Sequence, residues 1–126
     1  TCSGIGHVKL IKKCQKSGYE VTLLFLWLPN EQFAIRRVDS RVRQGGHNIP
    51  EDTIKRRYIR GIKNLINLYI PICNNIAIYD ASKNSSFATG DSMYPIIAKK
   101  ENNSQLQILD EKLWKKIERV LYDRKE

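Results

Sequence analysis

Two kinds of hydrophobic pattern occur along the chain, and they predict helices in some segments and strands in others. Residues 7–17 repeat apolar side chains at helical spacing among lysines, and Gly18 is a natural end for such a helix. Residues 20–28 form instead a nearly continuous apolar run. Such a run is typical of a strand that lies in a parallel sheet with both faces buried. The pattern therefore predicts a helix followed by a strand that is covered on both sides.

Two helices and a second strand are predicted to follow. Asn30 can cap a helix over about residues 31–44, which a pair of glycines ends. A further helix begins at Pro50, where two carboxylates in the first turn favour helix formation, and Pro71 ends it. Residues 75–79 are a short buried strand. The order helix, strand, two helices, strand predicts a doubly wound α/β sheet.

The remainder of the chain has a different character. Residues 81–91 form a polar loop, and residues 93–99 and 105–109 are predicted to be the two arms of a β-hairpin. Asp110 can cap a final amphipathic helix. Whether the hairpin joins the sheet or protects one of its edges stays open. Since two parallel strands alone make no sheet, we expect about two further βαβ units of ~30 residues each before Thr1.

Composition narrows the class of protein. The 126 residues are 41% hydrophobic and 28% charged, which is typical of a globular domain rather than of a disordered chain. The apolar runs are too short to cross a bilayer, and the opening residues do not resemble a secretory leader. Cys2, Cys14 and Cys73 lack metal-ligand spacing and are expected to be reduced thiols, which predicts a cytoplasmic protein.

Positive charge is the strongest chemical signal. The chain carries 22 lysines and arginines against 13 carboxylates, a formal net charge of +9. Between residues 36 and 60 eight cations face three carboxylates, and seven of the eight are arginines: Arg36, Arg37, Arg41, Arg43, Arg56, Arg57 and Arg60. Arginine binds phosphate oxygens through paired hydrogen bonds and keeps its proton. Two arginine-bearing helices that meet at a turn can therefore fold over a phosphate ligand, although a solvated basic face would explain the charge equally well.

The turn between these two helices contains Gly45, Gly46 and His47. Paired glycines permit left-handed backbone and the close approach of a ligand, and a histidine can donate a hydrogen bond to a phosphate. A turn histidine without a catalytic part is the simpler interpretation. No GxxxxGK[ST] phosphate loop, GxSxG elbow or HExxH metal motif occurs in the chain. By its own residues, the chain is not expected to complete a catalytic site.

This arginine-rich turn carries a resemblance to a known family. Residues 41–50, RVRQGGHNIP, and residues 54–65, IKRRYIRGIKNL, closely resemble the zeta-toxin-like P-loop kinases, in particular the bacterial group of predicted ABC-type ATPases. The resemblance covers residues 1–82. From Met93 onward the sequence matches nothing in the family.

The resemblance implies an enzyme that transfers the γ-phosphate of ATP to a hydroxyl group. Its fold is a three-layer α/β sandwich with mostly parallel strands, followed here by a β-hairpin and a helix. Residues 1–82 would be the C-terminal portion of the kinase domain, with a helical lid at residues 30–69, and residues 83–126 would complete the same domain. ATP and Mg²⁺ would bind through an N-terminal half outside these residues, so this chain alone is expected to be inactive. In the best-known toxins the acceptor is the sugar of UDP-N-acetylglucosamine, and an antitoxin protein restrains the enzyme.

The resemblance also implies roles for single residues in the lid. Arg41, Arg43 and Arg57 would be the catalytic lid arginines that clamp the phosphate in transfer. His47 and Arg56 would bind the phosphates of the nucleotide.

Residues outside the lid complete the implied site. Asp80 and Ser82 follow the second strand, where such kinases hold the adenine side of the nucleotide, although Asp80 could equally cap the strand end. Thr1 corresponds to a substrate-contacting threonine. Ser3 stands where the founding toxins have an arginine, so an identical acceptor is not implied.

Two other interpretations stay open. A basic nucleic-acid-binding module would use the positive charge together with exposed Tyr58 or Trp114 for base stacking, and its binding would depend steeply on salt. A structural interaction module would instead pair with another chain that supplies the missing strands.

Overall fold

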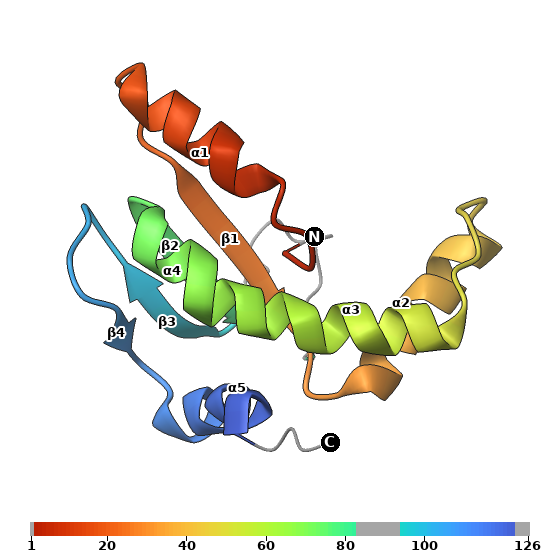
Figure 1. The fold of residues 1–126 in the computed structure, drawn as a ribbon. Helices are drawn as coiled ribbons and strands as arrows, with labels where there is room; N and C mark the ends of the chain where they lie inside the picture. Colours follow the sequence, from red (N-terminus) through yellow and green to blue (C-terminus); the bar gives the residue numbers. More distant parts are fainter. Residues whose placement is uncertain (1, 83–93, 123–126) are drawn as a thin grey trace, which may run out of the picture.

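The computed structural model describes residues 2–82 and 94–122, which form a mixed four-stranded sheet with helices (Figure 1). The strands lie in the order β1 (Thr22–Trp27), β2 (Asn75–Asp80), β3 (Ile96–Lys100) and β4 (Gln107–Ile108). β1 and β2 are parallel, and the other two pairs are antiparallel. The predicted parallel pair in an α/β fold is confirmed, but the described strands do not form a mostly parallel sheet.

The helices connect and cover these strands. They are α1 (His7–Lys16), α2 (Glu31–Arg43), α3 (Glu51–Asn64), a π-helical turn η1 (Leu65–Tyr69), α4 (Ile70–Ile72) and α5 (Glu111–Tyr122). α3, η1 and α4 follow one another as one long helix. α2 packs against α3, and the two form a helical hairpin that extends beyond the sheet (Figure 1). None of the helices described is long and apolar enough to cross a membrane.

The long helix ends at Ile72, so the end predicted at Pro71 is displaced by one residue. Proline has no backbone N–H and is tolerated in the first turn of a helix. The wide π-turn shifts the hydrogen-bond register, so that Pro71 lies in the first turn of α4. The carbonyl of Ile70 beside it accepts a hydrogen bond of 2.6 Å from Nζ of the buried Lys100.

The prediction that the first strand is covered on both faces is also wrong for the described residues. Leu24 is 64% exposed and Leu26 46% exposed, whereas Trp27 next to them is 3% exposed. β1 is an edge strand with β2 as its neighbour, and its side chains alternate between the exposed and the covered face. The hairpin joins the sheet at the opposite side, because β3 pairs with β2.

The core lies between the sheet and the helices. The most deeply buried large aliphatic and aromatic side chains come from four elements: Ile62, Leu65 and Tyr69 of the long helix, Ile76 and Ile78 of β2, Ile97 of β3 and Ile117 of α5. Burial of each aliphatic side chain of this kind contributes about 1.5–3 kcal/mol to stability. The core therefore holds the long helix, and with it one arm of the helical hairpin, firmly on the sheet.

Polar contacts fix the segment before α1 to the long helix. Asn64 Nδ2 donates to the carbonyls of Cys2 at 2.8 Å and Ser3 at 3.0 Å. The Tyr69 hydroxyl donates to the carbonyl of Gly4 at 2.6 Å. These contacts place Cys2 between the long helix and β1.

Candidate functional site

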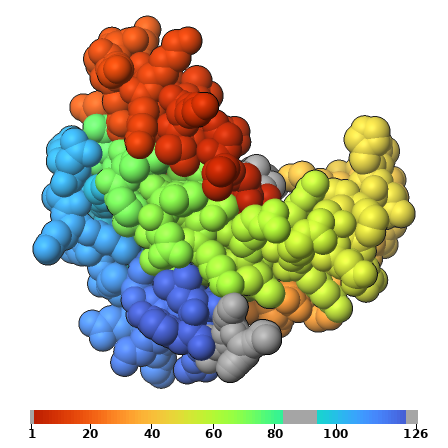
Figure 2. All heavy atoms as spheres, in the orientation of Figure 1, coloured from red at the N-terminus to blue at the C-terminus, as the bar shows by residue number. Residues whose placement is uncertain are grey.

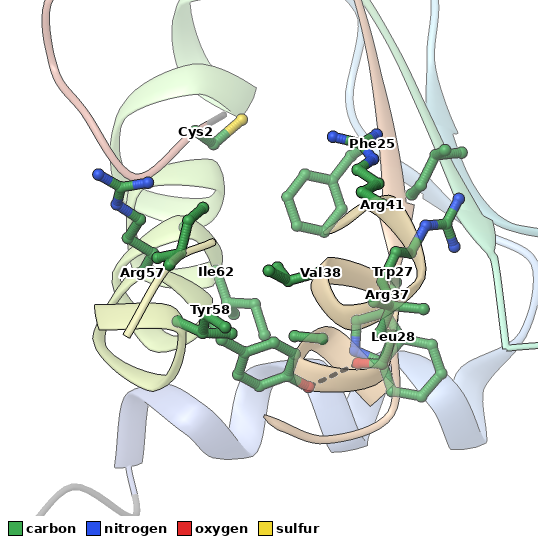
Figure 3. Close-up of a pocket in the computed structure, with 15 residues that line it drawn as sticks. Cys2, Phe25, Trp27, Leu28, Arg37, Val38, Arg41, Arg57, Tyr58 and Ile62 are labelled. Carbon is green, nitrogen blue, oxygen red and sulfur yellow. Dashed lines mark hydrogen bonds between the residues drawn. The ribbon is translucent and has the colours of Figure 1, made fainter. Parts of the chain in front are cut away.

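A cavity of about 300 Å³ lies between the helical hairpin and the carboxyl end of β1 (Figure 3). Its deeper wall is apolar and is formed by Phe25 and Trp27 of β1, Val38 of α2 and Ile54 and Ile62 of α3. In the space-filling view a recess separates the N-terminal segment from the projecting end of the helical hairpin (Figure 2). Ligands of open α/β sheets bind at the carboxyl ends of parallel strands. The position of the cavity therefore favours a binding site.

Three arginines from two helices line the cavity. Arg37 and Arg41 come from α2, one helical turn apart, and Arg57 comes from α3 on the other side. Arg57 and Arg41 stand on opposite sides of the cavity, with Val38 between them (Figure 3). We call Arg37, Arg41 and Arg57 the cavity arginines.

The cavity arginines have no acidic partner in the described part of the chain. The ion pair found there joins Lys99 to Glu101 at 4.0 Å, and no described carboxylate lies that close to a cavity arginine. The three side chains are exposed, and like charges around one opening repel one another. An anion between the guanidinium groups relieves this repulsion. The arrangement is therefore suited to bind a phosphate or carboxylate group.

Tyr58 closes the inner end of the cavity. Its hydroxyl donates a hydrogen bond of 2.5 Å to the carbonyl of Leu28, which joins α3 to the end of β1 (Figure 3). Burial raises the pKa of Tyr58 to about 12, and the carboxylate of Glu31 adds to this effect. The hydroxyl therefore stays protonated, and able to donate, at neutral pH.

Tyr58→Phe tests this hydrogen bond through its pH dependence. We expect the free energy of unfolding to fall by about 0.5–1.5 kcal/mol at pH 7, because the Leu28 carbonyl loses its donor. Since the folded pKa of about 12 lies above the ordinary value of 10, the contribution of Tyr58 is complete below pH 10 and is lost as the pH rises through 12. Denaturant titrations between pH 7 and pH 12 should therefore show the variant and the wild type converging. A gap that does not change with pH would contradict this role, and Tyr122→Phe at an exposed position is the matched control.

Cys2 lies at the opposite, outer end of the cavity (Figure 3). Burial raises the pKa of its thiol, and the thiol of Cys73 raises it further. A thiol in this state is protonated at neutral pH and is a poor nucleophile. Cys2 therefore contributes shape to the cavity rather than covalent chemistry.

Two of the five predicted lid residues meet at this cavity. All five side chains are exposed, and Arg41 and Arg57 line the cavity whereas Arg43, His47 and Arg56 do not. Successive residues of an α-helix are rotated by about 100°, so Arg43 points to another side of α2 than Arg41 does. A catalytic role for Arg43 and nucleotide binding by His47 and Arg56 stay predictions.

The glycine pair of the turn lets the backbone fold back against the last turn of α2. The Gly46 N–H donates to the carbonyl of Arg41 at 2.7 Å, and a Cβ atom at Gly46 would lie 2.9 Å from that oxygen. Gly45 adopts a φ of +98°, which other residues avoid. The two glycines thus end α2 directly after the turn that carries Arg41.

The other predicted site residues lie elsewhere. Asp80 is 2% exposed at the end of β2, and its Oδ1 accepts hydrogen bonds from the Ser82 N–H at 3.0 Å and the Ser82 hydroxyl at 2.5 Å. These are the contacts of a strand-end cap, the alternative that the sequence left open, and neither residue lines the cavity. Thr1 lies outside the described residues.

Sequence reasoning did not select several of the residues that shape the cavity. Arg37 was recognised as part of the basic run but not as a site residue, although its spacing of four from Arg41 places both on one face of a helix. Phe25 and Cys2 depend on how β1 and the N-terminal segment pack, for which the sequence carries no local signal. Gly61 of α3 is buried and also lines the cavity.

Gly61→Ala tests whether this glycine is required for the fold. A Cβ atom at Gly61 would have the Ser3 nitrogen as its nearest neighbour at 3.8 Å, which is an ordinary contact. Since glycine disfavours a helix interior by about 0.8–1 kcal/mol relative to alanine, we expect the variant to unfold at a higher denaturant concentration. Gly45→Ala is the matched control and should destabilise the protein, because φ is positive there. A destabilised Gly61→Ala variant would show that the N-terminal segment packs more tightly on α3 than described.

The described residues hold no cluster of three or more histidine, cysteine or acidic side chains that could bind a metal ion. The cavity offers cations and apolar surface instead, which fit the phosphates of a ligand and not Mg²⁺ itself.

Comparison with known proteins identifies one relative of unknown function. An uncharacterized protein of Haemophilus influenzae is 33% identical over 58 residues, which are 46% of this chain and 41% of that protein. The chain thus matches about two fifths of the length of this curated relative. No family model and no solved structure matches the chain.

Proposed function

We propose that this chain is part of an ATP-dependent small-molecule kinase similar to the zeta toxins, and that the helical hairpin is its lid. The observation that carries the proposal is the cavity formed by Arg37, Arg41 and Arg57, which come from two helices and have no acidic partner among the described residues. Phosphoryl transfer depends on positioning and on the neutralisation of charge by such groups. The lid would release or admit ligand by moving about the turn at residues 44–50.

The fold is compatible with this proposal at the level of architecture. A parallel β1–β2 pair connected through helices is the unit of a P-loop kinase sandwich, and the cavity lies at the carboxyl end of β1. A third layer of the proposed sandwich would cover the exposed face with Leu24 and Leu26. β3, β4 and α5 share the core with residues 2–82, which supports a single domain.

The remaining components of the reaction would come from outside these residues. ATP and Mg²⁺ would be held by a phosphate loop elsewhere in the enzyme, and the cavity arginines would meet the phosphate between ATP and a hydroxyl-bearing acceptor such as a nucleotide sugar. An antitoxin protein would be the regulatory partner, and the cytoplasm the expected location.

Inorganic pyrophosphate is a direct probe of the cavity in the 126-residue chain. We expect Arg41→Ala and Arg57→Ala each to weaken pyrophosphate binding roughly tenfold or more, because each removes a charge-assisted hydrogen bond. Arg36→Ala and Arg60→Ala are the controls, because they remove the same charge from the same two helices at positions outside the cavity. Isothermal titration at two salt concentrations is the measurement. Equal losses in all four variants would show that the ligand responds to net charge alone and would favour the nucleic-acid module.

The structure removes one support for that alternative. Trp114 is 8% exposed and belongs to the core, and Tyr58 is half-buried with its hydroxyl bonded to Leu28. The expectation that either side chain is exposed for base stacking is therefore wrong, because each packs against the sheet or the end of β1.

A further inference from the structure

A second hollow of about 640 Å³ follows the free edge of β1 and adjoins the arginine cavity, with which it shares Cys2, Phe25, Leu26, Leu28, Arg37 and Arg41. It runs along residues 21–26, and α1 contributes Leu10 and Ile11 while Tyr69 and Cys73 form its end. We call it the edge slot. Leu10 is 57% exposed and Leu24 64% exposed in it, so a large apolar surface lacks cover in the described part of the chain.

The two edges of the sheet are built differently. β4 is a two-residue edge strand, and such short strands do not template pairing. β1 has six residues, TLLFLW, without a charge or a proline, and its pairing with β2 shows no bulge. Natural edges of this length carry such devices to block pairing with other chains. The sequence of β1 is therefore that of an inner strand.

The helices indicate which strand would fill the edge slot. α1 lies on the same face as the long helix, because Gln15 donates to the carbonyl of Ile72 at 2.7 Å and Ile11 shares the core with Tyr69. Connections between parallel strands are right-handed in nearly all proteins. The crossover from β1 to β2 passes over this face. A strand that precedes α1 and connects through it to β1 with the same handedness must therefore lie on the side of β1 opposite β2. That side is the free edge.

We propose that the edge slot holds a fifth strand that is parallel to β1 and belongs to polypeptide leading into Cys2. Cys2 lines both the edge slot and the arginine cavity, so a strand that ends there connects to α1 through residues 2–6 without a further loop. This continuity distinguishes it from a strand of a partner protein or of a second copy. The end of the strand lies beside Arg37 and Arg41, which line both hollows.

The experiment compares the protein purified from its native source with the 126-residue chain by intact mass and amide hydrogen exchange. We expect the native protein to extend N-terminally from Cys2. Those β1 amides that point away from β2 should exchange at least about tenfold more slowly in it than in the 126-residue chain. Amides of β2, which is paired on both sides, and of β4 serve as controls and should exchange alike in both proteins.

Three results would overturn the proposal. The native protein could begin at Thr1, or it could be longer and leave the β1 amides unprotected. Sedimentation could also show that the 126-residue chain is a dimer with protected β1 amides, which would assign the edge slot to a second copy. The proposal does not depend on the kinase function, since pyrophosphate binding by the cavity arginines is measured separately and either result can fail alone.

Discussion

Replacing Arg41 or Arg57 by alanine is expected to lower kcat roughly 10²–10³-fold in the longer kinase that the proposed function requires. The two side chains reach the opening from α2 and α3 without a carboxylate to neutralise them. Their electrostatic interaction with the phosphate in transfer should therefore be strongest in the transition state, when negative charge develops on it. The ground-state affinity for ATP should change far less, because the phosphate loop would supply most of it. Single-turnover rates and ATP dissociation constants measured on the same variants test this difference.

Two kinds of control make the result specific to the cavity. Arg36→Ala and Arg60→Ala change the net charge by the same amount at positions of α2 and α3 that do not line the cavity, and they should leave the rate within a few-fold of wild type. Arg57→Lys keeps the charge but loses the paired hydrogen bonds, so its rate should lie between those of wild type and Arg57→Ala. Equal effects of Arg41→Ala on rate and on ATP affinity would contradict the lid role. A slow Arg43→Ala variant would assign catalysis to another side of α2.

Much of the fold is predictable from the sequence because its signals are local. The caps at Asn30 and Asp110 form as expected, with Phe33 N–H and Leu113 N–H as their donors. The asparagines of the predicted hairpin turn adopt the positive φ that such turns need. The burial of β1 was mispredicted because it does not depend on local signals. A continuous apolar run shows that both faces are suited to burial, but whether each is covered depends on chain beyond the strand.

The candidate site was predictable only as far as helix geometry reaches. The i, i+4 spacing puts Arg37 and Arg41 on one side of α2, and it could have excluded Arg43 from that side. The choice between Arg56 and Arg57 depends on the rotation of α3 about its axis. That rotation is set by Ile62 in the core and by the Tyr58 hydrogen bond to Leu28. Contacts between residues so far apart in the chain leave no local pattern.

The position of Cys2 is even harder to predict from the sequence, because it depends on contacts between residues far apart in the chain. Asn64 and Tyr69 hold the carbonyls of residues 2–4 across more than sixty positions of the sequence. An asparagine and a tyrosine within a helical pattern would be assigned to the solvent face and to the core. In the structure their polar atoms instead join the N-terminal segment to the long helix. Through this segment the arginine cavity and the edge slot share one wall.

Trp27→Ala is expected to lower the free energy of unfolding by about 3–5 kcal/mol. Trp27 is 3% exposed at the end of β1, where it packs in the core and lines the arginine cavity. Such a loss is a large part of the total stability of a domain, commonly about 5–15 kcal/mol. Part of the variant could therefore be unfolded at room temperature, and chemical denaturation should be followed at 10–15 °C, near the usual maximum of stability.

Leu26→Ala, one residue before, is the matched control for Trp27→Ala. Leu26 is 46% exposed on the other face of β1, so in the 126-residue chain its truncation should change the free energy of unfolding by less than about 1 kcal/mol. Comparable losses in both variants of this chain would contradict the one-sided burial of β1. In a longer protein that covers the second face, the loss for Leu26→Ala should rise toward the range of about 2–5 kcal/mol found for buried leucines. The same pair of variants therefore shows whether one or both faces of β1 are covered in each protein.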